Sequence, residues 1–175
     1  MPMKEIYRSA MEWLYIACIV AAGVAMLVIT TIIPYGVFMR YVVNSPSAWP
    51  EPAGILMMVL FSFVGGAAAY RANAHITVGA LLNMLNDVNR KRLERFGDIG
   101  MGIIGLFMVK WGFQLVYAMW QSGNTIAEFP WMPVGVTYSP IPVAGVITLL
   151  FCIERLWLGQ PPETSFTFRD QPQAE

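Results

Sequence analysis

The stretch WLYIACIVAAGVAMLVITTIIPYGVFMRY, residues 13–41, decides the fold of this chain. A hydrocarbon core about 30 Å thick is crossed by about 20 apolar residues of helix, and this stretch is longer than that. In lipid each backbone N–H and C=O must be bonded within its own segment, so the stretch must be helical. Three more apolar stretches follow it. We therefore predict an all-α integral membrane protein with four transmembrane helices, at about residues 13–41, 50–71, 92–121 and 137–158.

The composition agrees with a single membrane domain over residues 1–175. The chain is 57% hydrophobic and 13% charged, whereas a soluble domain averages about 25% charged residues. Its formal net charge is zero, so nothing in the charge favours nucleic-acid binding. Cys18 and Cys152 both lie inside predicted spans, where unpaired thiols pack as small hydrophobic groups. One histidine and two cysteines are too few for a zinc site, and we expect no metal.

Small residues at helical spacing predict that the spans pack closely. Ala17, Ala21 and Ala25 recur every four residues in the first span, which lets a second helix approach its backbone. The third span is rich in glycine near its start, at Gly97, Gly100, Gly102 and Gly105. These glycines do not form a GxxxG pair, so they predict close packing in general and no particular dimer motif.

The segment between the second and third spans predicts an amphipathic helix on the membrane surface, at about residues 76–89. Its apolar residues follow helical spacing, and about a dozen residues are too few to cross a bilayer. A basic cluster follows at headgroup level, where it can orient the chain and contact anionic lipids. The cluster consists of Arg90, Lys91, Arg92 and Arg95. Residues 160–175 show no periodicity and predict a disordered tail.

The distribution of lysine and arginine predicts the topology. If both termini and the middle loop face the cytoplasm, nine of the eleven basic residues lie inside and only Arg40 lies outside. Lys110 falls within the third span. Cytoplasmic loops are enriched in basic residues, so the N-in/C-in arrangement is the one expected.

Lys110 is the ionisable residue nearest the middle of a predicted span. An unpaired charge at the centre of a bilayer costs about 3 kcal/mol on insertion scales. Lys110 either faces protein, in a polar pocket or against an acidic group of a partner, or extends its stem toward the headgroups. The spans otherwise carry little charge, and the chain shows no internal repeat, no phosphate-binding loop and no nucleophile–base pair. This pattern is typical of an accessory subunit and not of an enzyme.

Residues around the first two spans resemble a known family. Arg40 ends the first span, Trp49-Pro-Glu51 opens the second, and Arg71-Ala-Asn-Ala-His75 follows it. In this order and spacing they resemble the small membrane subunit (DctQ-like) of tripartite ATP-independent periplasmic (TRAP) transporters, over about residues 10–158. The family commonly has two acids after the tryptophan, whereas Pro52 follows Glu51 here. That departure puts in doubt any role that needs the second carboxylate.

The resemblance implies a non-catalytic scaffold subunit in the bacterial inner membrane, with no cofactor of its own. Its partners would be a larger multi-span subunit, which holds the sodium and substrate sites and moves substrate by an elevator-like motion, and a periplasmic binding protein. The imported solute would be an organic acid, either a C4-dicarboxylate or a sugar acid.

The resemblance also suggests roles for residues at both ends of the spans. On the outer face, candidate contacts for the binding protein are Arg40, Trp49, Glu51, Glu128 and Trp131. Arg40 and Glu51 either pair or are solvated separately, and the tryptophans either contact the partner or anchor the chain at the interface. On the inner face, Arg71 and His75 either fix the turn into the surface helix, by binding carbonyls or lipid phosphate, or are ordinary positive-inside residues.

Two other classes of function remain open at this point. A self-sufficient small carrier acting as a homodimer would have to use Lys110 for its substrate. A membrane anchor of a redox complex would bind a cofactor, but a single histidine cannot supply both axial ligands of a bis-histidine haem.

Overall fold

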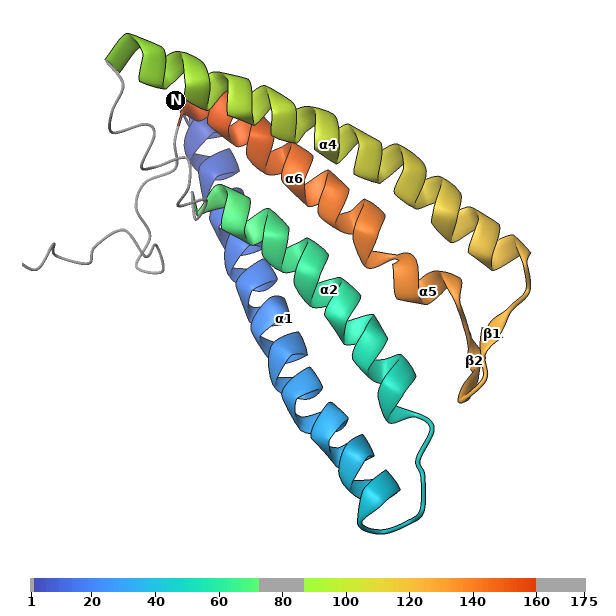
Figure 1. Ribbon diagram of the computed structural model, residues 1–175. Coiled ribbons are helices and arrows are strands. Elements are labelled where there is room, and N and C mark those ends of the chain that lie inside the picture. Colours follow the sequence, from blue (N-terminus) through green and yellow to red (C-terminus); the bar gives the residue numbers. More distant parts are fainter. Residues whose placement is uncertain (1, 73–86, 160–175) are drawn as a thin grey trace, which may run out of the picture.

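The computed structural model describes residues 2–72 and 87–159 (Figure 1). Its elements in chain order are α1 (Pro2–Tyr41), α2 (Pro50–Arg71), α4 (Asp87–Gln121), β1 (Thr125–Ile126), β2 (Phe129–Pro133), α5 (Gly135–Tyr138) and α6 (Pro140–Leu158). Within these residues, four helical segments are long and apolar enough to cross a membrane: Lys4–Tyr41, Pro50–Arg71, Arg95–Gln121 and Gly135–Leu158. The prediction of an all-α membrane protein with four spans is confirmed.

The second span begins and ends where the sequence predicts. Pro50 and Pro52 lie in the first turn of α2, where a missing backbone N–H leaves no helical hydrogen bond unmade. Glu51 lies beside them, near the positive end of the helix dipole. Because these signals are local, the sequence alone was enough to place this helix.

Two other helices are longer than predicted. α1 begins at Pro2 and not near residue 13, and its 40 residues give a length of about 60 Å. α4 has 35 residues, or about 52 Å. Polar residues at the start of each helix do not interrupt it. Hydropathy therefore locates the part of a helix that crosses lipid, but it does not locate the first residue of the helix. Residues 87–89, predicted to end the surface helix, instead begin α4. The rest of that predicted helix and the predicted tail lie outside the described residues.

The segment between α4 and α6, for which the sequence predicted no helix or strand, contains secondary structure of its own. β1 and β2 form an antiparallel hairpin, in which Thr125 is opposite Pro133 and Ile126 is opposite Phe129. The last span was predicted to begin at Thr137, but the one-turn helix α5 comes first and α6 starts at Pro140. Pro140 has no N–H to continue the ladder from α5, and it therefore occupies the first position of a new helix.

The four long helices form two helical hairpins that meet along one pair of helices. α1 packs on α2, α4 packs on α6, and the two hairpins are joined mainly through α2 and α6. Figure 1 shows the hairpins close together where α2 and α6 end, and diverging toward the β1–β2 hairpin. We call these two ends of the bundle the convergent end and the open end.

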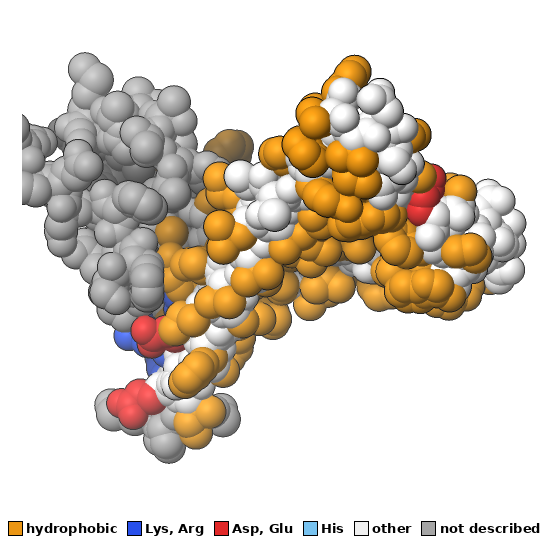
Figure 2. Space-filling view, turned by 90° about the horizontal axis from the view of Figure 1, so that it is seen from below, with side chains coloured by type: hydrophobic (Ala, Val, Ile, Leu, Met, Phe, Trp, Pro, Cys, Tyr) orange, Lys and Arg blue, Asp and Glu red, His pale blue; other side chains and the backbone are white. Residues whose placement is uncertain are grey.

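Much of the surface is apolar. Large hydrophobic side chains are exposed on α1, α2, α4 and α6. Figure 2 shows hydrophobic side chains covering most of the described surface when it is viewed from below, with charged groups near the margins. Exposing so much apolar surface to water is unfavourable. The surface is therefore suited to contact with lipid or with another membrane protein.

Small residues allow the close contacts, although not all at the predicted positions. α1 presents Tyr15, Cys18, Ala22 and Ala25 to its neighbours, whereas Ala17 is exposed. The predicted ridge of Ala17, Ala21 and Ala25 is therefore partly wrong. The buried face follows Cys18 and Ala22, one residue later, before it reaches Ala25. Gly65 of α2 faces this buried stripe, since a Cβ built on it would lie 3.5 Å from the Cβ of Ala22.

Glycines bring α4 and α6 together most tightly. A Cβ on Gly105 would lie 3.0 Å from Leu149 Cγ, and one on Gly112 would lie 3.0 Å from the backbone N of Pro142. Gly145 of α6 fits against α4 in return, with its would-be Cβ 3.0 Å from the backbone N of Val109. A Cβ built on Gly97 or Gly100, in contrast, would meet no described atom of another helix within 4 Å. We call the contact through Gly105, Gly112 and Gly145 the glycine seam.

Gly145→Ala should destabilise the protein, because the added methyl group meets backbone that cannot move without shifting α4. Overpacking of this kind costs about 1–3 kcal/mol. Gly66→Ala is the matched control, since Gly66 has open space around it and alanine favours a helix by about 0.5–1 kcal/mol. Thermal unfolding of the purified chain in mild detergent measures both. Equal melting temperatures for the two variants would contradict close packing of α4 on α6 at the glycine seam.

Candidate functional site

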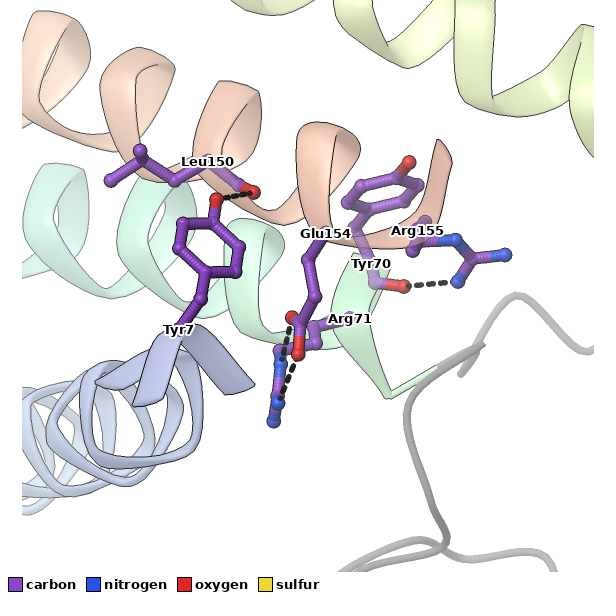
Figure 3. Close-up of polar contacts among 6 residues, drawn as sticks. All are labelled: Tyr7, Tyr70, Arg71, Leu150, Glu154 and Arg155. Carbon is purple, nitrogen blue, oxygen red and sulfur yellow. Dashed lines mark hydrogen bonds and ion pairs between the residues drawn. The ribbon is translucent and has the colours of Figure 1, made fainter. Parts of the chain in front are cut away.

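Buried charged side chains gather at the convergent end. Arg71, the last residue of α2, binds Glu154 of α6 through two nitrogens of its guanidinium (Figure 3). Nε donates to Oε2 at 2.8 Å and Nη2 donates to Oε1 at 2.9 Å. The two side chains are 3% and 0% exposed. This paired geometry matches the planar fork of arginine to a carboxylate, which makes it a strong ion pair.

Aromatic rings complete the surroundings of Arg71. The guanidinium carbon lies 5.0 Å from the centre of the Tyr15 ring and 5.5 Å from that of Phe151. Cation–π attraction from rings on α1 and α6 therefore supplements the ion pair. Arg71 contacts three of the four long helices, counting its own.

A second buried pair joins α4 to the same place. Nε of Arg155 lies 2.8 Å from Oδ1 of Asp98, and the hydroxyl of Tyr70 donates to the same oxygen at 2.9 Å. Nη1 of Arg155 also donates to the backbone carbonyl of Tyr70 at 3.3 Å, as Figure 3 shows. We call Tyr70, Arg71, Asp98, Glu154 and Arg155 the polar junction. It connects α2, α4 and α6 through side chains that are all buried.

Two further hydrogen bonds strengthen this end of the bundle. The hydroxyl of Tyr7 donates to the carbonyl of Leu150 at 3.1 Å, which ties α1 to α6 (Figure 3). Cys152 Sγ donates to the carbonyl of Asp98 at 3.1 Å. Cys18 and Cys152 are free and buried, as predicted.

The structure uses Arg71 differently from the prediction. We expected it to bind lipid phosphate or nearby carbonyls, or to be a solvated basic residue, but it is buried and paired with Glu154. Sequence reasoning missed Asp98 and Glu154 as functional candidates. One signal was available: two acids and two arginines occur at the ends of three apolar spans, and charges at such positions usually pair.

The structure describes some of the other predicted inner-face residues. Arg92 and Arg95 are exposed on α4, consistent with headgroup contact. Arg90 and Lys91 also belong to α4. His75 lies outside the described residues.

At the open end, three predicted outer-face residues line one pocket of about 460 Å³. They are Arg40 from the end of α1, Glu51 from the start of α2, and Glu128 from the turn between β1 and β2. Among the described residues no ion pair within 4.0 Å joins Arg40 to Glu51, so these charges remain available to a partner. We call this the outer pocket.

The two predicted outer-face tryptophans do not line the outer pocket. The ring of Trp49 lies 5.8 Å from that of Tyr35. Trp131 lies 6.1 Å from Phe129, and 74% of its surface is exposed. Both lie on segments next to the outer pocket, in the loop before α2 and in β2.

Lys110 is exposed on α4, away from the polar junction. Its Nζ lies 4.7 Å from the centre of the Trp111 ring, and that ring stacks on Phe107 at 4.5 Å. Cation–π attraction contributes up to about 2 kcal/mol in a dry site, which offsets only part of the roughly 3 kcal/mol cost of a charge at mid-membrane. The ammonium group therefore needs another partner.

Within the described residues there is no cluster of three or more metal-ligating side chains. The carboxylates of the polar junction bind arginines, which already neutralise them. The arrangement is suited to holding helices together.

Comparison with known proteins identifies one family. The family described as "Tripartite ATP-independent periplasmic transporters, DctQ component" matches residues 29–160. A protein of Haemophilus influenzae named "Putative TRAP transporter small permease protein" is 25% identical over 155 residues, which cover 88% of this chain and 91% of that protein. The family match includes α2, α4 and α6, and hence the polar junction.

Arg71→Met should destabilise the bundle by about 3–5 kcal/mol, because it leaves the Glu154 carboxylate buried without its partner. The double variant Arg71→Met/Glu154→Met should recover most of that loss, since both charges are then gone. Unfolding midpoints in mild detergent measure the series. Arg92→Met is the matched control, since this exposed arginine should change stability by less than about 0.5 kcal/mol. A double variant no more stable than Arg71→Met would show that the pair is not the source of the effect.

Proposed function

Because this chain belongs to the DctQ component family of TRAP transporters and is a multi-pass protein of the inner membrane, we propose that it is the non-catalytic scaffold subunit of a sodium-coupled importer of an organic acid. A larger membrane subunit carries the sodium and substrate sites. A periplasmic binding protein delivers the solute. This chain holds the larger subunit in place and helps to dock the binding protein.

The observation that carries this proposal is how the buried charges are used. In the described bundle, Arg71 pairs with Glu154 and Arg155 pairs with Asp98. Ionisable groups inside membrane spans commonly mark substrate or ion pathways, whereas here one pair joins α2 to α6 and the other joins α4 to α6. A rigid bundle of this kind suits a static support for a moving subunit.

The proposed orientation places both termini in the cytoplasm. The distribution of lysine and arginine supports it, because nine of the eleven lie at the N-terminus, in the middle segment or near the C-terminus. The polar junction then lies at the cytoplasmic side, and the outer pocket lies at the periplasmic side.

The outer pocket is the proposed docking point for the binding protein. It presents two carboxylates, Glu51 and Glu128, beside Arg40. Trp49 and Trp131 supply aromatic surface close by, which is common in the centre of protein interfaces. The sequence departure at Pro52 fits this site, since Pro52 lines the pocket and Glu128, from a different segment, supplies a second carboxylate.

Reconstitution tests the proposal. Proteoliposomes with this chain, the larger subunit and the binding protein should take up a radiolabelled organic acid when a sodium gradient is imposed. Omission of this chain should reduce uptake to background, and this chain alone should give none. Uptake by this chain alone would support a self-sufficient carrier, and full uptake without it would remove the scaffold role.

Glu51→Gln/Glu128→Gln should weaken docking without loosening the membrane complex. Rim charges act mainly on the rate of association, so uptake at low binding-protein concentration should fall about threefold to tenfold. Saturating binding protein should restore it, and the effect should shrink at high salt. Glu12→Gln, which removes an exposed acid from α1 outside the outer pocket, is the control. Unchanged uptake at every concentration would place the docking site elsewhere.

A further inference from the structure

One face of α4 carries an unexplained row of polar side chains. Lys110, Gln114, Tyr117 and Gln121 follow one another at intervals of four, three and four residues. Residues at these intervals lie on one side of a helix. All four are exposed, and Tyr117 retains 66% of its surface. We call this row the polar stripe.

The polar stripe lies on the side of α4 that faces away from the rest of the bundle. The opposite side holds Gly105 and Gly112, which touch α6. Lys110 and Gln114 are each two residues from Gly112, and at 3.6 residues per turn this places them nearly opposite to it. Figure 1 shows α4 at the edge of the bundle, where it runs along α6 and α5.

Lipid is a poor neighbour for this stripe. Lys110 is eleven residues from Gln121 and fifteen from Arg95, which is about 17 Å and 22 Å along the helix. A lysine stem is much shorter than either distance. Helical side chains also tilt toward the helix N-terminus, which for Lys110 is away from the nearer surface.

The residues that the structure describes do not neutralise Lys110 or satisfy Gln114. Gln121 Nε2 donates to the hydroxyl of Tyr117 at 2.9 Å, and the Lys110 ammonium lies over Trp111. These contacts leave the carbonyl of Gln114 and the charge of Lys110 open to a neighbour. Among the described residues, the buried carboxylates are those of Asp98 and Glu154, and both bind arginines at the convergent end.

We propose that the polar stripe is the surface that binds the larger transporter subunit, through a transmembrane helix that presents a carboxylate at the depth of Lys110. The inference rests on the proposed function, because it presumes that subunit. The partner helix offers polar groups opposite Gln114 and Tyr117. The four-three-four spacing suits it, since helices that cross at a shallow angle meet along such a stripe. Exposed apolar residues beside the stripe, such as Ile103, Phe107 and Phe113, extend the contact.

Photo-cross-linking in native membranes tests this placement. A photoreactive amino acid at position 114 leaves Lys110 in place and should give an adduct with a larger multi-span protein, identified by mass spectrometry. The same probe at Leu27, which is 70% exposed on α1, measures the background for an exposed apolar position. A yield at position 114 at least about fivefold above that background supports the proposal. An equal yield, an adduct with lipid only, or an adduct with a second copy of this chain would overturn it.

Substitution of Lys110 tests the charge. Lys110→Gln should lower recovery of the larger subunit with the tagged chain at least about tenfold, because it leaves a carboxylate of the partner unpaired. Lys110→Arg should retain recovery. Lys4→Gln, which removes an exposed lysine from the start of α1, should also leave it unchanged. Full recovery with Lys110→Gln would overturn the role of the charge.

The two proposals fail in different ways. If the unsubstituted chain recovers no larger membrane subunit, both the scaffold function and this interface fail. If it recovers that subunit, but position 114 does not cross-link to it, the scaffold function stands and only the interface is overturned.

Discussion

The ion pair between Arg71 and Glu154 is the contact on which the rest of the bundle depends. In water such a pair can separate at little cost, but in a membrane each free charge would have to be buried unpaired or carried to the surface. The two-pronged geometry, at 2.8 and 2.9 Å, sets the register of α2 against α6. Since α1 packs on α2 and α4 packs on α6, this register positions both helical hairpins.

This constraint acts at one end only, and the shape follows from it. The polar junction and the Tyr7 hydrogen bond hold the helices together at the convergent end. At the open end the hairpins diverge (Figure 1), and the outer pocket forms where Glu128 of the β1–β2 turn lines the same space as Arg40 and Glu51. A bundle fixed at one end and splayed at the other exposes more apolar surface than a compact four-helix bundle. That surface suits the proposed role, in which this subunit supports another protein within the membrane.

The sequence alone predicted the elements that depend on local signals. Hydropathy located four spans, and prolines together with Glu51 marked the start of α2. The sequence alone could not show that Arg71 pairs with Glu154. These residues are 83 positions apart, and only the packing of α2 on α6 brings them together. The predicted alanine ridge was partly wrong because alanines occur on several sides of α1, and the neighbouring helix decides which of them are buried.

The β1–β2 hairpin was missed because strands of two and five residues leave almost no periodicity. Of the outer-face candidates, Arg40, Glu51 and Glu128 meet in one pocket although they come from three segments, a convergence visible only in the fold.

The same physical rule accounts for both the internal and the external charges of the bundle. A charge in a medium of low dielectric constant must be neutralised nearby, or it destabilises whatever holds it. At the convergent end, two arginines and two acids satisfy this rule within one chain, and the result is a rigid core. Among the residues that the structure places, Lys110 meets an aromatic ring but no carboxylate, and it lies on the side of α4 opposite the glycine seam. Within the described residues, the buried carboxylates of Asp98 and Glu154 are each paired with an arginine, whereas an unpaired lysine at mid-membrane would cost stability. The position of Lys110 therefore supports the proposed interface, in which a buried acid of the larger subunit is neutralised when the two subunits assemble.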